Sequence, residues 1–338
     1  MLRTFRPDLM RTTIAAVLAL TAALALPASA QTQATSLDDL VSAVVGIKTF
    51  IDPDARTRES LGRVREGSGI VIDESGLVLT IGYLMVEAHA AEVVTNAGRT
   101  LPASVVGYDH ETGFGLLRTI EPLKLKPLGL GKSEALKTGD PVLVASFGGV
   151  QMVAPARVVS KREFAGNWEY VLDEAIFTAP PHPVWSGAAL IARDGKLVGV
   201  GSLIVGDAAG KGEPGAGNMF VPIDRLPPIL ADLIADGRAS GPGRPWIGLA
   251  AEEANGRLTV GRVTAGGPAE KAGVARGNVI AGVNGEAAKT LADFYRKVWA
   301  SGAAGASVPL DIEQSGTKRR IDVKSINRLD HLRLKSTF

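Results

Sequence analysis

The pattern of apolar and polar positions changes in stages along the 338-residue chain. An apolar run over 13–26 follows three arginines and ends in small residues at 27–30. Residues 36–47 then place apolar side chains at helical spacing behind a Ser36-x-x-Asp39 cap. This spacing predicts a short N-terminal helix.

The next stretch, residues 63–221, consists of short runs rich in Val, Ile and Leu between turn clusters such as 193–195. Many short strands at close spacing are typical of an all-β sandwich or barrel. A helix is predicted over 225–235. Residues 237–245 then contain two prolines and three glycines without an apolar period, the composition of a domain linker.

The remaining pattern predicts a second folded unit over residues 246–327. A short helix is expected over 268–272, because Pro opens it and Gly273 closes it. A longer helix is expected over 290–300. Gly316 is expected to turn a final hairpin.

Residues 1–30 have the three parts of a secretory signal peptide: a charged region, an apolar run and an Ala-x-Ala cleavage signal. The apolar run is shorter than the roughly 20 residues that cross a membrane. We therefore expect cleavage after Ala30, a periplasmic protein, and no transmembrane segment after signal cleavage.

Charge and composition exclude several functions. Of the 37 basic and 35 acidic residues, residues 1–30 contain three and one, so the rest of the chain is balanced and no nucleic acid partner is expected. The chain has no cysteine, which excludes thiol catalysis and disulfides. Its four histidines lack metal-ligand spacing, so we expect no metal and no cofactor.

Ordered motifs relate the chain to a known family. The first set is GSGIVID at 67–73, GLVLT at 76–80 and NMFVPID at 218–224. The second set is GPAEKAG at 267–273, RGNVI at 276–280 and VNG at 283–285. In this order they resemble the HtrA (DegP-like) serine proteases, and the second set resembles their PDZ domain.

The resemblance implies a mainly β fold, with a trypsin-like double six-stranded β-barrel domain followed by an α+β PDZ domain. The expected organisation is a signal peptide at 1–30, a segment with the N-terminal helix at 31–62, the trypsin-like domain at 63–236, a linker at 237–245, the PDZ domain at 246–327 and a basic tail at 328–338.

The family's chemistry needs a His, an Asp and a Ser, in that order. By resemblance the histidine position is Tyr83, a poor proton acceptor near neutral pH, and the aspartate position is Gly113. Ser186 occupies the nucleophile position. Val184 and Ser186 occupy the oxyanion-hole positions. Glycine normally supplies the backbone geometry at the first of these, and a β-branched residue such as Val184 resists it.

Two alternatives remain open at this site. Ser186 is either a small residue that the turn requires or a working nucleophile. A substitute base would have to be His182, four residues before it, or His110, beside Asp109.

The PDZ resemblance places carboxylate capture in the loop Trp246-Ile247-Gly248-Leu249, with Phe294 on the opposite groove wall. The alternative is that this strand only packs the domain, and Leu291 and Val298 are assigned to the core. The terminal Ser336-Thr337-Phe338 also has the form of a PDZ ligand.

The resulting interpretation is an exported, proteolytically inactive HtrA-like protein that binds C-terminal or unfolded segments of envelope proteins, as a scaffold, holdase or regulatory subunit. The family resemblance also implies a homotrimer, or a mixed oligomer with an active HtrA-like protease. The alternative is an active serine-type endopeptidase in periplasmic quality control, using Ser186 with a non-standard base.

Overall fold

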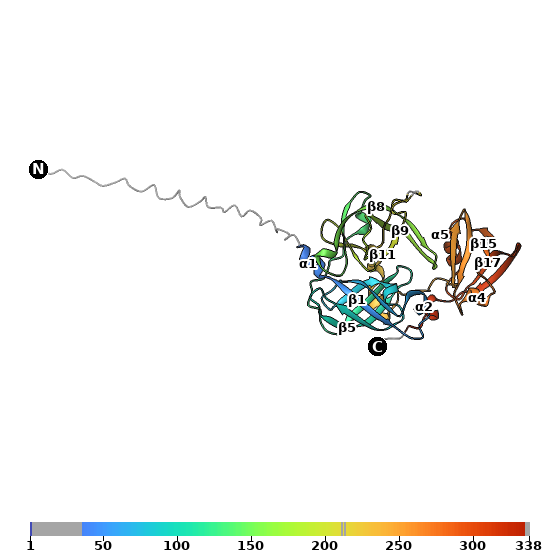
Figure 1. The fold of residues 1–338 in the computed structure, drawn as a ribbon, viewed down its shortest axis with the longest axis horizontal. Coiled ribbons are helices and arrows are strands. Elements are labelled where there is room, and N and C mark those ends of the chain that lie inside the picture. Colours follow the sequence, from blue (N-terminus) through green and yellow to red (C-terminus); the bar gives the residue numbers. More distant parts are fainter. Residues whose placement is uncertain (2–35, 211, 213, 335–338) are drawn as a thin grey trace. The chain divides into compact units, whose positions relative to one another are not determined.

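The computed structural model describes Met1, residues 36–210, Gly212 and residues 214–334. The predicted signal peptide and the terminal Ser336-Thr337-Phe338 lie outside the described residues. The architecture consists of two closed barrels and one further sheet (Figure 1).

Each barrel contains six antiparallel strands. The first is formed by β1 (Val44–Ile51), β2 (Val64–Val71), β3 (Leu77–Ile81), β4 (Ala88–Val94), β5 (Thr100–Tyr108) and β6 (Phe114–Thr119). The second is formed by β7 (Pro141–Ala145), β8 (Val153–Gly166), β9 (Tyr170–Ala179), β10 (Ala189–Ile191), β11 (Leu197–Val205) and β12 (Gly217–Pro222). The predicted double six-stranded barrel is confirmed.

The start of the first barrel differs from the expectation. The N-terminal helix α1 (Leu37–Ser42) is shorter than predicted, and its cap is Ser36, whose hydroxyl accepts the N–H of Asp39. Residues that continued the helical spacing, Val44 and Val45, instead begin β1 and are fully buried between β2 and β4. A short β-branched run is compatible with both the helical and the strand period, and burial in the barrel favours the strand. The barrel therefore begins before residue 63.

A third, separate sheet follows the linker. Its strands are β13 (Leu249–Ala254), β14 (Arg257–Val263), β15 (Val279–Val283), β16 (Glu286–Ala287), β17 (Ser307–Gln314) and β18 (Thr317–Lys324). Strand β13 is at one edge and β18 at the other. This sheet has its own apolar core, although it belongs to the same unit as the barrels.

Short helices connect the strands and follow the barrels and the third sheet. They are α2 (Arg58–Leu61), α3 (Pro227–Asp236), α4 (Pro268–Lys271), α5 (Leu291–Ala300) and α6 (Arg328–His331), with short 3₁₀ turns η1 (Gly82–Leu84), η2 (Ser133–Ala135), η3 (Val150–Met152) and η4 (Ile223–Arg225). Gly237 ends α3 in the left-handed conformation, as a C-terminal glycine does. The basic tail expected over 328–338 begins with α6.

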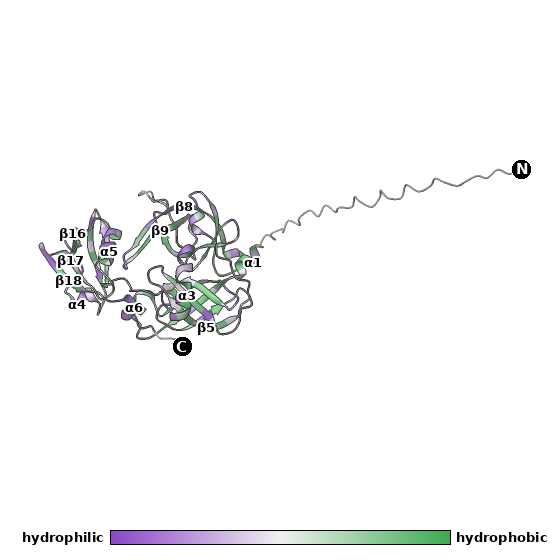
Figure 2. Ribbon diagram, turned by 180° about the vertical axis from the view of Figure 1, so that it is seen from behind, coloured by the Kyte–Doolittle hydropathy of each residue, from purple (hydrophilic) through white to green (hydrophobic). Residues whose placement is uncertain are grey.

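Hydropathy follows this arrangement. Figure 2 shows hydrophobic residues along the barrel strands and hydrophilic residues along β18, which is largely exposed. Within residues 36–210, 212 and 214–334, no helix combines the length and apolar character needed to cross a membrane.

Candidate functional site: a serine without a base, and an occupied PDZ loop

Ser186 lies in the segment between β9 and β10, held by both barrels. Its carbonyl oxygen accepts the N–H of Ser68 at 2.8 Å, and the N–H of Gly187 donates to the carbonyl of Gly201 at 2.9 Å. Gly187 has φ +73°, and a Cβ there would lie 1.9 Å from the carbonyl oxygen of Ser68. The turn therefore needs glycine after the serine, whether or not the serine reacts.

Tyr83, on η1, points to this serine. Its hydroxyl oxygen lies 2.8 Å from Ser186 Oγ and 2.8 Å from the carbonyl oxygen of Ser202. Because a carbonyl only accepts, the single phenolic proton goes to Ser202, and the Ser186 hydroxyl donates to the Tyr83 oxygen. Burial raises the pKa of Tyr83 to about 12. The serine proton therefore faces a neutral phenol, which is not a general base.

Gly113 lies in the turn before β6 with φ +83°. Its carbonyl accepts the N–H of Gly82 at 2.7 Å, so the turn fixes the backbone that leads to Tyr83. A Cβ at residue 113 would lie 3.3 Å from the hydroxyl of Tyr170. A side chain at this position would therefore be strained by φ and crowded by Tyr170.

The first candidate substitute base, His182, is buried and bonded within its own surroundings. Its Nδ1 lies 3.1 Å from the N–H of Val184 and 3.4 Å from Ser146 Oγ. Its backbone N–H donates to Asn218 at 2.6 Å. These bonds hold the loop before Ser186, and none of them reaches the serine hydroxyl.

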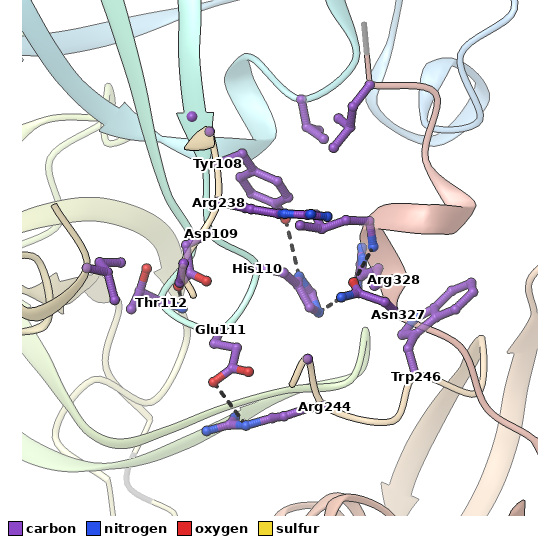
Figure 3. Close-up of a pocket in the computed structure, with 18 of the residues that line it drawn as sticks. Tyr108, Asp109, His110, Glu111, Thr112, Arg238, Arg244, Trp246, Asn327 and Arg328 are labelled. Atoms are coloured by element: carbon purple, nitrogen blue, oxygen red, sulfur yellow. Dashed lines mark hydrogen bonds and ion pairs between the residues drawn. The ribbon is translucent and has the colours of Figure 1, made fainter. Parts of the chain in front are cut away.

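The second candidate, His110, lies in a different place, a cavity of about 1250 Å³ (Figure 3). Arg328 donates to its Nε2 at 2.8 Å, so the ring proton is on Nδ1, which lies 3.2 Å from the Tyr108 hydroxyl. Burial first, and the charge of Arg328 second, hold the pKa of His110 well below its usual value. Its bonds to Tyr108 and Arg328 keep it in this cavity, and none of them reaches Ser186.

Val184 occupies the position that the resemblance assigns to the oxyanion hole. Its φ lies outside the left-handed region, which in this structure includes Gly187 but not Val184. In the His182 tautomer with its proton on Nε2, the N–H of Val184 donates to Nδ1 at 3.1 Å; the same Nδ1 lies 3.0 Å from the carbonyl oxygen of Val184. An oxyanion hole needs that donor free and aimed at the reacting oxygen. In this geometry, the imidazole of His182 uses it instead.

The loop before β13 has the geometry of an anion-binding turn. Gly248 has φ +77°, and the backbone N–H groups of Ile247, Gly248 and Leu249 point to one place. That place is occupied by the carboxylate of Glu169, at 3.1, 2.7 and 3.1 Å. The backbone of Trp246 instead pairs with Ile326, so Trp246 fixes where the loop begins.

Glu169 was not anticipated from the sequence. It stands in the turn Asn167-Trp168-Glu169-Tyr170 between β8 and β9, and a charged residue in a turn is ordinarily solvated. Phe294 also differs from the expectation of a groove wall, because it is fully buried in the apolar core of the third sheet. Leu291 and Val298 belong to that core as expected, and Leu291 also borders the surface groove beside β13.

Comparisons with known proteins agree with this architecture. Residues 67–200 match the family described as trypsin-like peptidase domain, and residues 245–325 match the family described as PDZ domain. The third sheet with α4 and α5 is therefore the PDZ domain that the motifs indicated.

Curated relatives are serine proteases. The chain is 33% identical over 248 residues to serine protease PepD of Mycobacterium tuberculosis, covering 68% of this chain and 52% of PepD. It is 32% identical over 265 residues to a probable periplasmic serine endoprotease DegP-like of Pseudomonas putida, covering 73% and 52%. The Escherichia coli periplasmic pH-dependent serine endoprotease DegQ is 26% identical over 260 residues, covering 73% and 56%. The chain thus spans about half the length of these relatives.

A solved structure shows the same fold. The HtrA-type protease AlgW with decapeptide aligns with a TM-score of 0.52 and 21% identity, covering 89% of this chain and 99% of that chain. The order of domains, the two family matches and these relatives agree. The chain belongs with the HtrA (DegP-like) proteins, as a trypsin-like peptidase domain followed by one PDZ domain.

Proposed function

We propose that this protein is an exported, proteolytically inactive HtrA-like homologue that captures exposed C-termini of envelope proteins through its PDZ domain. The observation that carries this proposal is the pair formed by Tyr83 and Ser186. The hydroxyl of the serine meets a neutral phenol where proteolysis would need a base.

The size of the expected loss supports inactivity over slow catalysis. In serine proteases, removing triad members leaves only a rate acceleration of about 10³ to 10⁴ over water, and this remaining acceleration depends on the oxyanion hole. Losing one hole donor costs a further factor of about 10² to 10³. Here Tyr83, Gly113 and the engaged N–H of Val184 remove the base, its orienting carboxylate and one donor together.

A carboxylate-binding role for the PDZ domain is supported by the loop 247–249. Three backbone N–H groups converge on one carboxylate within hydrogen-bond distance. PDZ domains capture a C-terminal carboxylate in this way and add the peptide as a strand to a sheet edge. The edge strand here is β13, which leads directly from the loop.

The location and assembly of the protein are part of the proposal. Curated relatives are named periplasmic serine endoproteases, which supports a periplasmic location after removal of residues 1–30. We propose a homotrimer, or a mixed oligomer in which this chain regulates an active HtrA-like protease. Co-expression with such a protease, followed by size-exclusion chromatography, tests the second form: strictly separate oligomers would contradict it.

The deciding experiment is hydrolysis of unfolded β-casein by the purified mature protein, with Ser186→Ala prepared identically as the matched control. A catalytically complete DegP-like protease is the positive control. We expect no cleavage by either form during long incubation. Cleavage by the wild type that disappears in Ser186→Ala would contradict the proposal and favour an active endopeptidase.

A further inference from the structure

The contact between Glu169 and the PDZ loop lies outside the degenerate protease site. Glu169 is 3% exposed, and φ of +60° places it in the left-handed region. Non-glycine residues adopt this region rarely, and then usually because the surroundings require it. Aromatic rings hold this turn, since Trp168 and Tyr170 are stacked with centroids 5.5 Å apart. The turn therefore presents the carboxylate in a fixed position.

The carboxylate of Glu169 has the partners that a peptide terminus would have. It accepts three backbone N–H groups from residues 247–249. Buried N–H groups are costly to leave unpaired. The side chain of Glu169 thus satisfies the donors that a C-terminal carboxylate would otherwise satisfy.

An apolar side chain accompanies the carboxylate, as in a peptide ligand. Val171, two residues after Glu169, is 8% exposed and belongs to the apolar cluster of the PDZ domain. Ala165, on β8, packs against the same cluster. The β8–β9 hairpin therefore gives the PDZ domain both a carboxylate and a buried aliphatic group.

Polar contacts around the hairpin strengthen this docking. Arg296 of α5 pairs with Glu163 at 2.6 Å and with Asp173 at 2.7 Å. Arg328 of α6 donates to the carbonyl of Trp168 at 2.9 Å. The ion pairs of Arg296 are about half exposed, and pairs of that kind contribute little. The buried carboxylate of Glu169 is therefore the contact that mainly holds the β8–β9 hairpin on the PDZ domain.

Space remains farther along the binding surface. A groove of about 800 Å³ lies between residues 163–168 of the hairpin, residues 251–254 of β13 and residues 290–292 of α5. The hairpin thus fills the end that receives the carboxylate, while the groove beside β13 stays open. An incoming peptide would find room for its body but not for its terminus.

We infer that Glu169 is an internal ligand of the PDZ domain, which an external C-terminal carboxylate must displace together with the β8–β9 hairpin. This inference rests on the proposed function, because it assigns a regulation to the same carboxylate site. The apparent affinity for an external peptide is then its intrinsic affinity reduced by the fraction of molecules in which the hairpin is undocked. In Glu169→Gln, an amide NH₂ replaces one carboxylate oxygen and cannot accept a backbone N–H, so one of the three donors in the loop loses its partner and that fraction increases.

The test is fluorescence anisotropy with labelled decapeptides that share one Ala/Lys body and end in Val, Leu, Ile or Phe. The proteins are the full mature chain, Glu169→Gln and Glu169→Asp. The matched control is Glu174→Gln, on the same hairpin, whose carboxylate is exposed and pairs with Lys161. Peptides with an amidated terminus show whether the carboxylate is what binds.

We expect Glu169→Gln to bind at least one peptide about tenfold or more tightly than the wild type, because its amide NH₂ cannot accept a backbone N–H and leaves one donor of the loop unpaired. Glu169→Asp keeps the charge but is one methylene shorter, so its gain should be intermediate. Glu174→Gln should match the wild type. Equal affinities in all four proteins would overturn the internal-ligand inference and leave the proposed function intact, whereas binding by none of them would overturn both.

Amide hydrogen exchange tests the contact without any peptide. In Glu169→Gln, the N–H groups of Gly248 and Leu249 should exchange at least about tenfold faster than in Glu174→Gln, because the hairpin that supplies their acceptor is undocked in a larger fraction of the molecules. Exchange elsewhere in the barrels should be equal, which shows that both variants are folded. Unchanged exchange at these two residues would overturn the inference whatever the peptides do.

Discussion

The hydroxyl groups of Tyr83 and Ser186 lie 2.8 Å apart, and the same Tyr83 oxygen lies 2.8 Å from the carbonyl of Ser202. The phenol therefore joins the turn of Ser186 to strand β11 where a protease would place its base. Tyr83, which offers Ser186 a neutral phenol, also contributes to the packing of the two barrels against each other.

Tyr83→Phe should lower the free energy of unfolding by about 1–3 kcal/mol, because the buried carbonyl of Ser202 and the hydroxyl of Ser186 both lose a partner. Ser186→Ala removes only one of these bonds and should cost less. Urea unfolding followed by tryptophan fluorescence measures both. Equal costs would show that the bond to Ser202 contributes nothing.

Restoring the family residues should not restore proteolysis. In Tyr83→His/Gly113→Asp, the new aspartate would have φ near +83° and its Cβ 3.3 Å from the Tyr170 hydroxyl, and the N–H of Val184 would still be bonded to His182. β-Casein hydrolysis should remain absent. Thermal unfolding of Gly113→Ala measures the loss of stability caused by the backbone conformation alone, without the charge of the aspartate. Cleavage that needs Ser186 would refute this prediction.

Gly98 and Gly187 have similar positive φ but differ in the space around a new Cβ, so substituting each with Ala separates backbone strain from steric clash. Gly98→Ala, at φ +80° with no atom within 4 Å of the new Cβ, should cost about 1 kcal/mol. Gly187→Ala, at φ +73°, would bring its Cβ within 1.9 Å of the Ser68 carbonyl and should cost more than about 3 kcal/mol or prevent folding. Soluble yield and thermal unfolding compare them, and similar losses would mean that the turn of Ser186 relaxes freely.

Stability should depend on pH through Glu169. Burial raises the pKa of this carboxyl from 4.5 to about 7, against the opposing effect of its three N–H partners and Arg328. Between these values the unfolded chain has released this proton and the folded chain retains it, so stability falls as pH rises. Relative to Glu169→Gln, the wild type should lose about 3 kcal/mol across this window.

The comparison with Glu169→Gln is needed because other groups titrate nearby. Arg328 and the phenol of Tyr295 face the carboxylate. His110 and His331, whose pKa values are both lowered, change stability in the opposite direction. These effects cancel in the difference between wild type and variant. Urea unfolding at several pH values between 4.5 and 7 measures it, and parallel pH profiles would contradict the assignment.

Local patterns predicted the many short strands and the PDZ helices, because apolar period, capping residues and glycine turns act within a few residues of one another, whereas the double barrel was implied by the family resemblance. The same rules failed at Val44, where a β-branched run fits two periods and only the neighbouring strands β2 and β4 decide between them. Local preference and tertiary burial disagreed there, and burial prevailed.

At the candidate site, too, some features were predictable from the sequence and others depend on tertiary contacts. Motif order placed Tyr83, Gly113 and Ser186 in the sequence, but the bond between the first and the third joins residues far apart in the chain. The engaged N–H of Val184 and the position of Glu169 depend on contacts between separate elements, and composition carries no signal of them. A glutamate in a turn is ordinarily solvated, so its burial became visible only in the fold.

The hairpin that carries Glu169 also flanks β13, which is the edge of the PDZ sheet. An uncovered edge strand offers its unpaired N–H and C=O groups to any other chain and is a common starting point for aggregation. The hairpin forms the opposite wall of the groove beside that edge, so undocking it to admit a ligand widens access to the edge in the same step. The bound ligand then becomes the strand that protects the protein from self-association.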